Sequence, residues 1–216
     1  MFFPRECLIC NAPGNELCQK CALSLSWPKP KRRNRQWMTS IWNYRDNRVQ
    51  QIIITLKNKP HARLAQICAN HFVKQILNQP KTHTDWMLVP VPISASRRRE
   101  RGYNQSELLA VAYQQALRTQ LVTKSSQNKL IGTLFPICKQ ALAKQRITIK
   151  QGTTKSREDR LENMHNVFIV SNPIHVRNKN IIIIDDVTTT GATLADAKRA
   201  LLEAGALKVL AWTVAN

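Results

Sequence analysis

The stretch Ile181-Ile-Ile-Ile-Asp185-Asp186-Val-Thr-Thr-Thr-Gly191-Ala-Thr193 decides how the rest of the sequence is interpreted. Its four consecutive isoleucines are typical of a parallel strand that is buried on both faces. Residues 194–204 then follow an amphipathic pattern that ends at Gly205, which predicts a helix. A strand, a glycine-containing turn and a helix N-terminus in this order favour an anion site at the carboxyl end of a parallel sheet.

Two carboxylates at the end of this strand restrict the kind of ligand. Asp185 and Asp186 would repel a phosphate, so we expect them to face hydroxyl groups or a metal. A ribose phosphate satisfies both requirements, with its 5-phosphate on the loop amides and its diol on the carboxylates. The predicted phosphate contacts are the loop residues Thr188, Thr189, Thr190, Gly191, Ala192 and Thr193. The alternative is a Walker B strand, but none of the six glycines begins the Walker A pattern that it requires.

The length and hydropathy of the chain set outer limits. With 216 residues, 43% of them hydrophobic, the chain can form one sizeable core and a small appendage. No apolar run approaches the roughly 20 residues of a membrane span. The opening Met1-Phe-Phe-Pro4 is too short for a signal peptide, so a cytoplasmic location is expected.

The net charge of +20 and the pI of about 10.3 are the most unusual bulk properties. Such an excess of positive charge attracts polyanions, and nucleic acid is the commonest of these. General solubility is the alternative explanation, although +20 is large for that purpose. The charge therefore favours contact with nucleic acid.

Two C-x-x-C units near the start of the chain predict a metal site. Paired units in a short polar segment suit tetrahedral zinc, and four thiolate ligands leave no open position, so the metal would be structural. Disulfides are the alternative, and a cytoplasmic location argues against them. The predicted zinc ligands are Cys7, Cys10, Cys18 and Cys21.

A basic, proline-containing segment divides the predicted zinc knuckle from the rest of the chain. We expect three units: a knuckle over 1–28, a linker over 29–36 and a main domain over 37–216. The linker is expected to insulate the main domain from loss of zinc. Aromatic residues beside basic ones also suit base stacking in single-stranded DNA, although packing into a core is the alternative for each ring. The candidate DNA contacts are Arg32, Arg33, Arg35, Trp37 and Trp42.

A second buried strand is predicted over 87–92, and it leads into an arginine-rich turn. Arginine binds phosphate oxygens through two parallel hydrogen bonds, so this turn is a candidate pyrophosphate site. The candidate residues are Arg97, Arg98 and Arg101. The alternative is an exposed basic loop.

Together these segments resemble the ComF family of competence proteins. The resemblance rests on the four cysteines, the block Val89-Pro-Val-Pro92 with Arg101-Gly-Tyr-Asn-Gln105, a central basic segment and the stretch 181–193. The stretch itself resembles the phosphoribosyl pyrophosphate (PRPP) loop of type I phosphoribosyltransferases. In the central segment the resemblance implies flexible-loop contacts from Arg146, Gln151 and Arg160. Lys144 departs from the family, which usually has arginine there.

The resemblance carries expectations about fold and function. It implies an α/β fold of the type I phosphoribosyltransferase kind, with a parallel sheet flanked by helices and a small N-terminal zinc knuckle. It also implies a site for PRPP with Mg²⁺ in which Asp185 and Asp186 serve as catalytic carboxylates. The implied role is in DNA uptake and natural transformation, on single-stranded DNA and with other competence proteins. Two alternatives stay open: a non-catalytic adaptor for nucleotide and DNA, and a small-molecule phosphoribosyltransferase unrelated to DNA.

Overall fold

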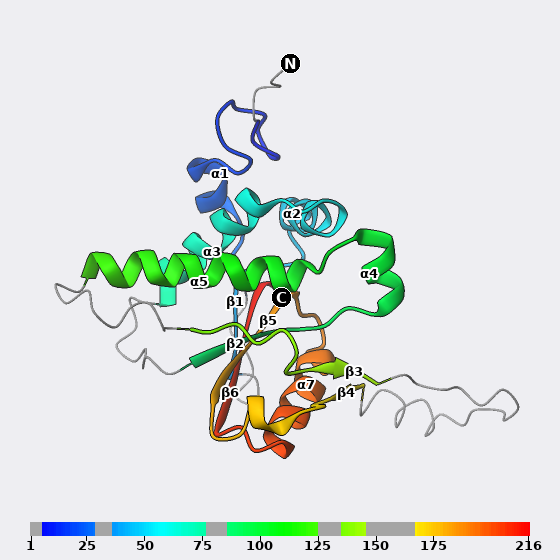
Figure 1. Ribbon diagram of the computed structural model, residues 1–216. Helices are drawn as coiled ribbons and strands as arrows, with labels where there is room; N and C mark the ends of the chain where they lie inside the picture. The colour runs from blue at the N-terminus through cyan, green and yellow to red at the C-terminus, as the bar shows by residue number, and fades with distance from the viewer. Residues whose placement is uncertain (1–5, 29–35, 77–85, 125–134, 146–166) are drawn as a thin grey trace, which may run out of the picture.

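A parallel sheet of four strands forms the centre of the molecule (Figure 1). The computed structural model describes residues 6–28, 36–76, 86–124, 135–145 and 167–216. The strands lie in the order β1-β6-β5-β2, and each neighbouring pair is parallel. Their bounds are Met38–Trp42 for β1, Trp86–Pro90 for β2, Asn180–Val187 for β5 and Lys208–Ala215 for β6. This arrangement confirms the predicted parallel sheet, with the isoleucine strand in its interior.

Helices cover both faces of the sheet, which explains the unbroken apolar run. Ile182 and Ile184 belong to one buried cluster, with residues of the helices α2 (Asn47–Asn58), α3 (Ala62–Ile76) and α5 (Gln105–Lys124). Ile181 and Ile183 belong to a second cluster, with residues of α7 (Ala192–Glu203). Successive side chains of a strand point to opposite faces, so each isoleucine of β5 is buried.

The N-terminal segment packs into the first of these clusters. Leu17, Cys21 and Leu25, on and beside the short helix α1 (Gln19–Ser24), are buried together with the apolar face of α2. Both the amide and the hydroxyl of Ser26 donate to Oδ2 of Asp46, at 3.2 and 3.1 Å. The knuckle (blue in Figure 1) thus sits against the helical layer. Core packing therefore joins the knuckle to the main domain independently of the linker, which argues against the expected insulation.

Residues 95–101 form a helix where the sequence predicted a turn. In α4 (Ala95–Arg101) the Ser94 hydroxyl accepts a hydrogen bond from the Arg97 amide at 3.3 Å. Gly102 ends the helix with a φ of 76°, a left-handed conformation that favours glycine. The run of charged residues hid this helix, because none of its residues is buried.

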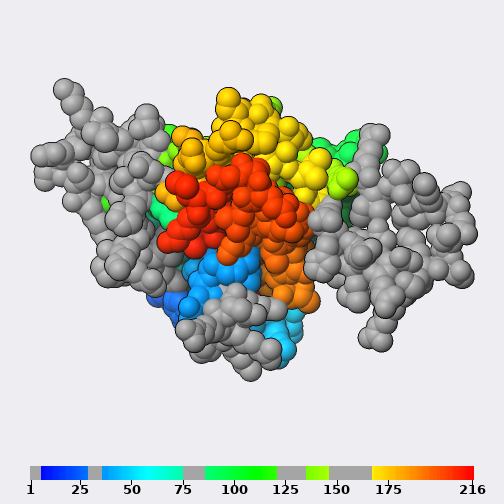
Figure 2. Space-filling view, turned by 90° about the horizontal axis from the view of Figure 1, so that it is seen from below, coloured from blue at the N-terminus to red at the C-terminus, as the bar shows by residue number. Residues whose placement is uncertain are grey.

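Three small elements complete the described structure. The antiparallel pair β3 (Ala143–Lys144) and β4 (Phe168–Ile169) flanks α7, and a 3-10 turn, η3, spans Pro173–His175. Figure 2 views the molecule from below, onto the amino ends of β5 and β6. There the Asn178 amide donates to the Gly205 carbonyl at 2.9 Å. Because Asp185 and Asp186 are at the carboxyl end of β5, the acidic edge lies at the opposite end of the sheet.

Among the described helices, none has the length and apolar character needed to cross a membrane.

Candidate functional site

Both carboxylates of the decisive stretch lie at the carboxyl end of β5 and are buried. Asp185 is 8% exposed and Asp186 is 2% exposed. Each is held by a different element of the chain, and neither of those contacts was predicted from the sequence. Such burial of two adjacent acids is costly unless positive groups or hydrogen bonds compensate it.

The hydroxyl of Ser106 holds Asp185. Ser106 Oγ donates to Asp185 Oδ1 at 3.0 Å, and the Asp186 amide donates to the same oxygen at 2.9 Å. Burial and then the charge of Asp186 raise the pKa of Asp185 well above its usual value. Ser106 is fully buried in the first turn of α5, and its only sequence signal is a small polar residue at the start of an apolar helix.

Residues 101–105 hold Ser106 and the end of α2 in position. The Asn104 side chain accepts from the Ser106 amide at 2.9 Å and donates to the Val91 carbonyl at 3.0 Å, so it joins α5 to the chain after β2. Its neighbour Tyr103 donates to the Leu56 carbonyl near the end of α2 at 2.7 Å. The block therefore fixes the position of Ser106, the residue that donates to Asp185, and contacts the end of α2.

Lys57 is the second residue in contact with the acidic pair that the sequence did not reveal. Its ammonium nitrogen lies 3.1 Å from Asp186 Oδ2. The sequence showed Lys57 only as the cation that ends the apolar run of α2. Its partner lies 129 positions away, so no local pattern could have paired them.

The loop after β5 leads directly into α7. Thr188 is buried and its amide donates to the Ala215 carbonyl at 3.0 Å, whereas Thr189 and Thr190 are exposed. Gly191, with a φ of 81°, is the N-cap residue that precedes α7, and no side chain caps this helix at that position. The neighbouring Thr190 hydroxyl accepts from the Ala192 amide at 3.3 Å. Helix amides and exposed hydroxyls at this position can receive an anion. Ala192 and Thr193 are exposed there as well.

The arginines of α4 lie beside this edge. The Val91 amide donates to the Ile184 carbonyl at 2.9 Å, which keeps the segment before α4 against the end of β5. Arg98 donates to Glu107 at 2.8 Å and Arg101 donates to Gln105 at 3.2 Å, whereas Arg97 is exposed. Two members of the predicted trio are thus hydrogen-bonded to α5, the helix that also carries Ser106.

Lys144 of β3 also reaches this environment. Burial lowers the pKa of the Lys144 ammonium, and the Arg97 charge lowers it further while Asp185 opposes that change. The group that departs from the family pattern is therefore a cation near the site. The predicted flexible-loop contacts Arg146, Gln151 and Arg160 lie outside the described residues.

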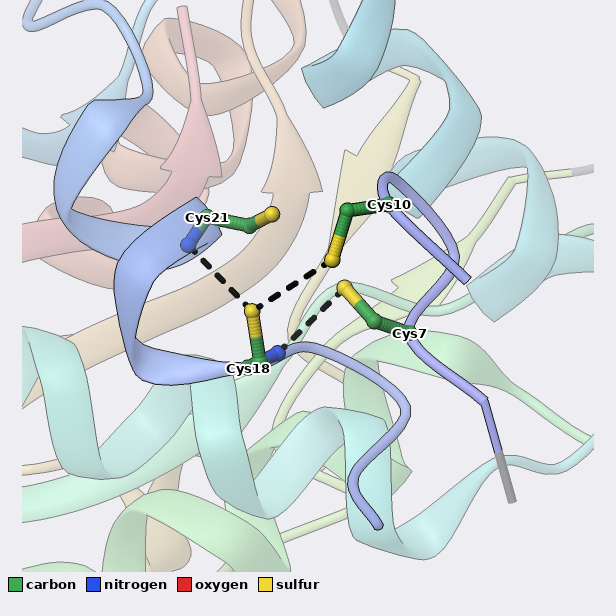
Figure 3. Close-up of side chains that lie close together, drawn as sticks. All are labelled: Cys7, Cys10, Cys18 and Cys21. Carbon is green, nitrogen blue, oxygen red and sulfur yellow. Dashed lines mark hydrogen bonds between the residues drawn. The ribbon is translucent and has the colours of Figure 1, made fainter. Parts of the chain in front are cut away.

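The four knuckle cysteines converge at one point (Figure 3). Their sulfur atoms all lie within 4.8 Å of one another, and those of Cys10 and Cys18 are 3.7 Å apart. Tetrahedral zinc with bonds of about 2.3 Å separates sulfurs by about 3.8 Å, so the spacing fits this metal. Amides of Cys18 and Cys21 donate to the sulfurs of Cys7 and Cys18, each at 3.4 Å. All six cysteines of the chain are free thiols, and all lie in described residues.

The electrostatics of the knuckle also favour a cation. Burial acts to raise the pKa of Cys7, but backbone N–H groups outweigh it and lower that pKa to about 6. Burial and the neighbouring sulfurs raise the pKa of Cys21 to about 12. Four thiolates this close would be stabilised by a bound cation, and zinc fits this set of ligands.

The aromatic candidates for DNA contact are less accessible than the sequence suggested. Trp42 is only 1% exposed, so its ring is a core residue and not a stacking surface. Trp37 is half-buried, with the Lys198 ammonium 4.3 Å from its ring centre. Trp27 is instead 58% exposed and lies 6.5 Å from the ring of His71. The candidates Arg32, Arg33 and Arg35 lie outside the described residues.

Comparison with known proteins defines the class of this fold and site. Residues 145–216 match the phosphoribosyl transferase domain. The DNA utilization protein YhgH of Escherichia coli (strain K12) is 26% identical over 209 residues, which cover 95% of this chain and 82% of that protein. Competence protein ComFC of Bacillus subtilis (strain 168) is 28% identical over 205 residues, covering 92% of this chain and 72% of that protein. Competence protein F of Haemophilus influenzae is 29% identical over 129 residues, covering 60% of this chain and 49% of that protein.

The class is therefore a phosphoribosyltransferase-like α/β protein, as predicted. The similarity to proteins named competence proteins and DNA utilization protein supports the predicted resemblance to the ComF family. Among solved structures, a glutamine PRPP amidotransferase from B. subtilis is similar at a TM-score of 0.41 and 17% identity, covering 74% of this chain and 30% of that chain. This chain thus spans less than a third of that longer protein.

Proposed function

We propose that the chain binds PRPP with Mg²⁺ at the carboxyl edge of β5 and acts in DNA uptake. The observation that carries the ligand is the buried pair Asp185 and Asp186, followed at once by the open N-terminus of α7. Relatives named as competence and DNA utilization proteins support the biological role. We extend that role to single-stranded DNA after its import, in natural transformation.

Different residues of the site contact three different parts of the ligand. Amides and hydroxyls of 188–193 hold the 5-phosphate, and the two aspartates hold the ribose diol. The arginines of α4 neutralise the pyrophosphate. Carboxylate oxygens suit Mg²⁺, which when bound supplies further neutralisation of the pyrophosphate charge.

Turnover and binding require different tests. If the anomeric bond breaks, positive charge develops on the sugar, and the buried carboxylates stabilise it. Release of pyrophosphate from PRPP in the presence of candidate acceptors identifies an enzyme. Binding without release identifies an adaptor that keeps the ligand without chemistry.

Titration calorimetry with PRPP and Mg²⁺ tests the ligand. The double change Asp185→Asn and Asp186→Asn keeps the shape of the site and removes its charge. Hydrogen bonds to charged groups contribute about 1.5–3 kcal/mol each, so affinity should fall about tenfold or more. Glu203→Gln, an exposed acid at the far end of α7, is the matched control. Equal affinity of the double variant and the unmodified chain would place the ligand elsewhere.

The DNA part of the proposal relies on net charge and on one exposed ring. The chain carries +20, and Trp27 directly precedes the basic segment 28–35. Base stacking on an aromatic side chain contributes about 1–3 kcal/mol, so Trp27→Ala should weaken the binding of single-stranded DNA by about fivefold or more. The control Leu207→Ala alters an equally exposed apolar side chain at the opposite end.

The salt dependence of DNA binding separates stacking from charge. Replacing Arg32, Arg33 and Arg35 with alanine should weaken binding to all DNA sequences alike. It should also reduce the slope of log affinity against log salt by about 0.7 per lost phosphate contact. Trp27→Ala should leave that slope unchanged. If gel-shift titrations at two salt concentrations detect no complex, the DNA role fails and a small-molecule transferase remains.

A further inference from the structure

Lys57 is the one cation that contacts the acidic pair directly among the described residues. Its ammonium lies 3.1 Å from Asp186 Oδ2, and the Asp186 side chain is 3% exposed while that of Lys57 is 28% exposed. No hydrogen bond from the described residues reaches this carboxylate oxygen. The Lys57 charge is therefore what compensates the burial of Asp186 in the absence of ligand.

A rigid element presents this lysine. The preceding residue, Leu56, is fully buried, and its carbonyl accepts the Tyr103 hydroxyl at 2.7 Å. At the other end of α2, Asp46 caps the helix by accepting from the Arg48 amide at 3.0 Å. The backbone of α2 is thus fixed at both ends, whereas the four-carbon stem of Lys57 keeps its rotatable bonds.

Arrival of the proposed ligand changes the balance of charge at Asp186. A divalent cation that approaches this carboxylate competes with the ammonium for the same oxygen. The ligand also brings phosphate oxygens, which are strong partners for lysine. A lysine side chain that is 28% exposed and flexible can move its ammonium between the two partners without movement of the helix.

We propose that Lys57 is an exchangeable counter-ion of this site: it neutralises Asp186 in the free protein and transfers to a phosphate oxygen of the bound ligand. This inference rests on the proposed PRPP site and adds a residue from outside the strand and loop that define it. Lys57 would then favour the complete ligand over a bare divalent cation, because only the complete ligand offers the ammonium a new partner.

Two binding measurements test the exchange. Lys57→Met removes the charge and keeps the length of the side chain. Mn²⁺ alone, followed by electron paramagnetic resonance, should bind this variant about tenfold more tightly than the unmodified chain. PRPP with Mg²⁺, followed by calorimetry, should bind it about tenfold more weakly, since a charge-assisted hydrogen bond is lost. Lys59→Met makes the same change in net charge on an exposed side chain two residues further on and should change neither affinity.

The opposite directions of the two effects identify the mechanism. A Lys57→Met variant that loses affinity for both ligands, or changes neither, would refute the exchange and leave a fixed structural ion pair. If the unmodified chain binds no PRPP, the proposed function fails, while tighter Mn²⁺ binding by the variant still supports the counter-ion and unchanged Mn²⁺ binding refutes it. Should Lys57→Met fail to fold, Lys57→Gln is used with the same expectations.

Discussion

We expect loss of Cys10, a predicted zinc ligand, to destabilise the whole molecule and not only its N-terminal segment. Cys10 is exposed, so Cys10→Ser removes a predicted zinc ligand without leaving a cavity in the core. If the knuckle then detaches, Leu17 and Leu25, each 2% exposed, lose their burial in the cluster shared with α2. Burial of a leucine contributes about 1.5–3 kcal/mol, which gives about 3–6 kcal/mol for the pair.

That loss is a large part of the stability of an ordinary domain, which is about 5–15 kcal/mol. For a chain of this size, 1 kcal/mol shifts the melting temperature by about 2–4 °C, so the expected decrease is about 6–24 °C. Differential scanning calorimetry with and without a zinc chelator measures it. Cys138→Ser, at a half-buried thiol outside the knuckle, is the control and should melt near the unmodified chain.

The reasoning is refuted if the main transition stays in place. A small early transition, confined to the N-terminal segment, with an unchanged main transition would show that the knuckle and the sheet domain unfold independently. The shared core would then contribute nothing to the stability of α2.

Two further outcomes follow from contacts at the acidic edge and at the N-terminus of α2. Ser106→Ala removes the hydroxyl that orients Asp185. Loss of this buried hydrogen bond should weaken the binding of PRPP about tenfold, as measured by calorimetry. The control Thr119→Ala removes an exposed hydroxyl further along α5 and should leave PRPP binding unchanged. Hydrogen bonds from Arg48, aided by those from Ser26, hold the pKa of Asp46 below its usual range despite burial, so its stabilisation is present above about pH 4 and lost as pH falls further. Asp46→Asn should therefore lower the free energy of unfolding by about 1 kcal/mol at pH 7, a modest amount because Arg48 is 40% exposed, and by less near pH 3. Urea titrations at both pH values measure this difference. A difference that does not depend on pH would contradict the role of the ion pair.

Much of the fold could be predicted from local sequence patterns. The four isoleucines indicated a strand buried on both faces, and packing of β5 against two helical layers confirms this. The knuckle spacing likewise led to the four converging sulfurs. Such features are recoverable because the residues that define them are close together in the chain.

The remaining site residues depend on contacts between distant segments. Ser106 and Lys57 reach adjacent carboxylates from α5 and α2, and no periodicity of either helix indicates that. Exposure of the tryptophans was equally hidden, since Trp42 and Trp27 occur in similar polar surroundings but lie in the core and at the surface. Charge concealed α4, because a short helix with no buried face has no apolar pattern to detect.

The position of β6 between β1 and β5 determines when the sheet can form during translation. Among the described strands β1 pairs with β6 alone, and the hydroxyls of Ser40 and Thr213, 2.6 Å apart, are separated by 173 positions. The sheet cannot be completed until residues 208–215 emerge from the ribosome. Until then β1 and one side of β5 remain unpaired apolar edges. Contacts of such separation form slowly, and the nascent chain is therefore exposed to aggregation and to chaperone capture for most of its synthesis.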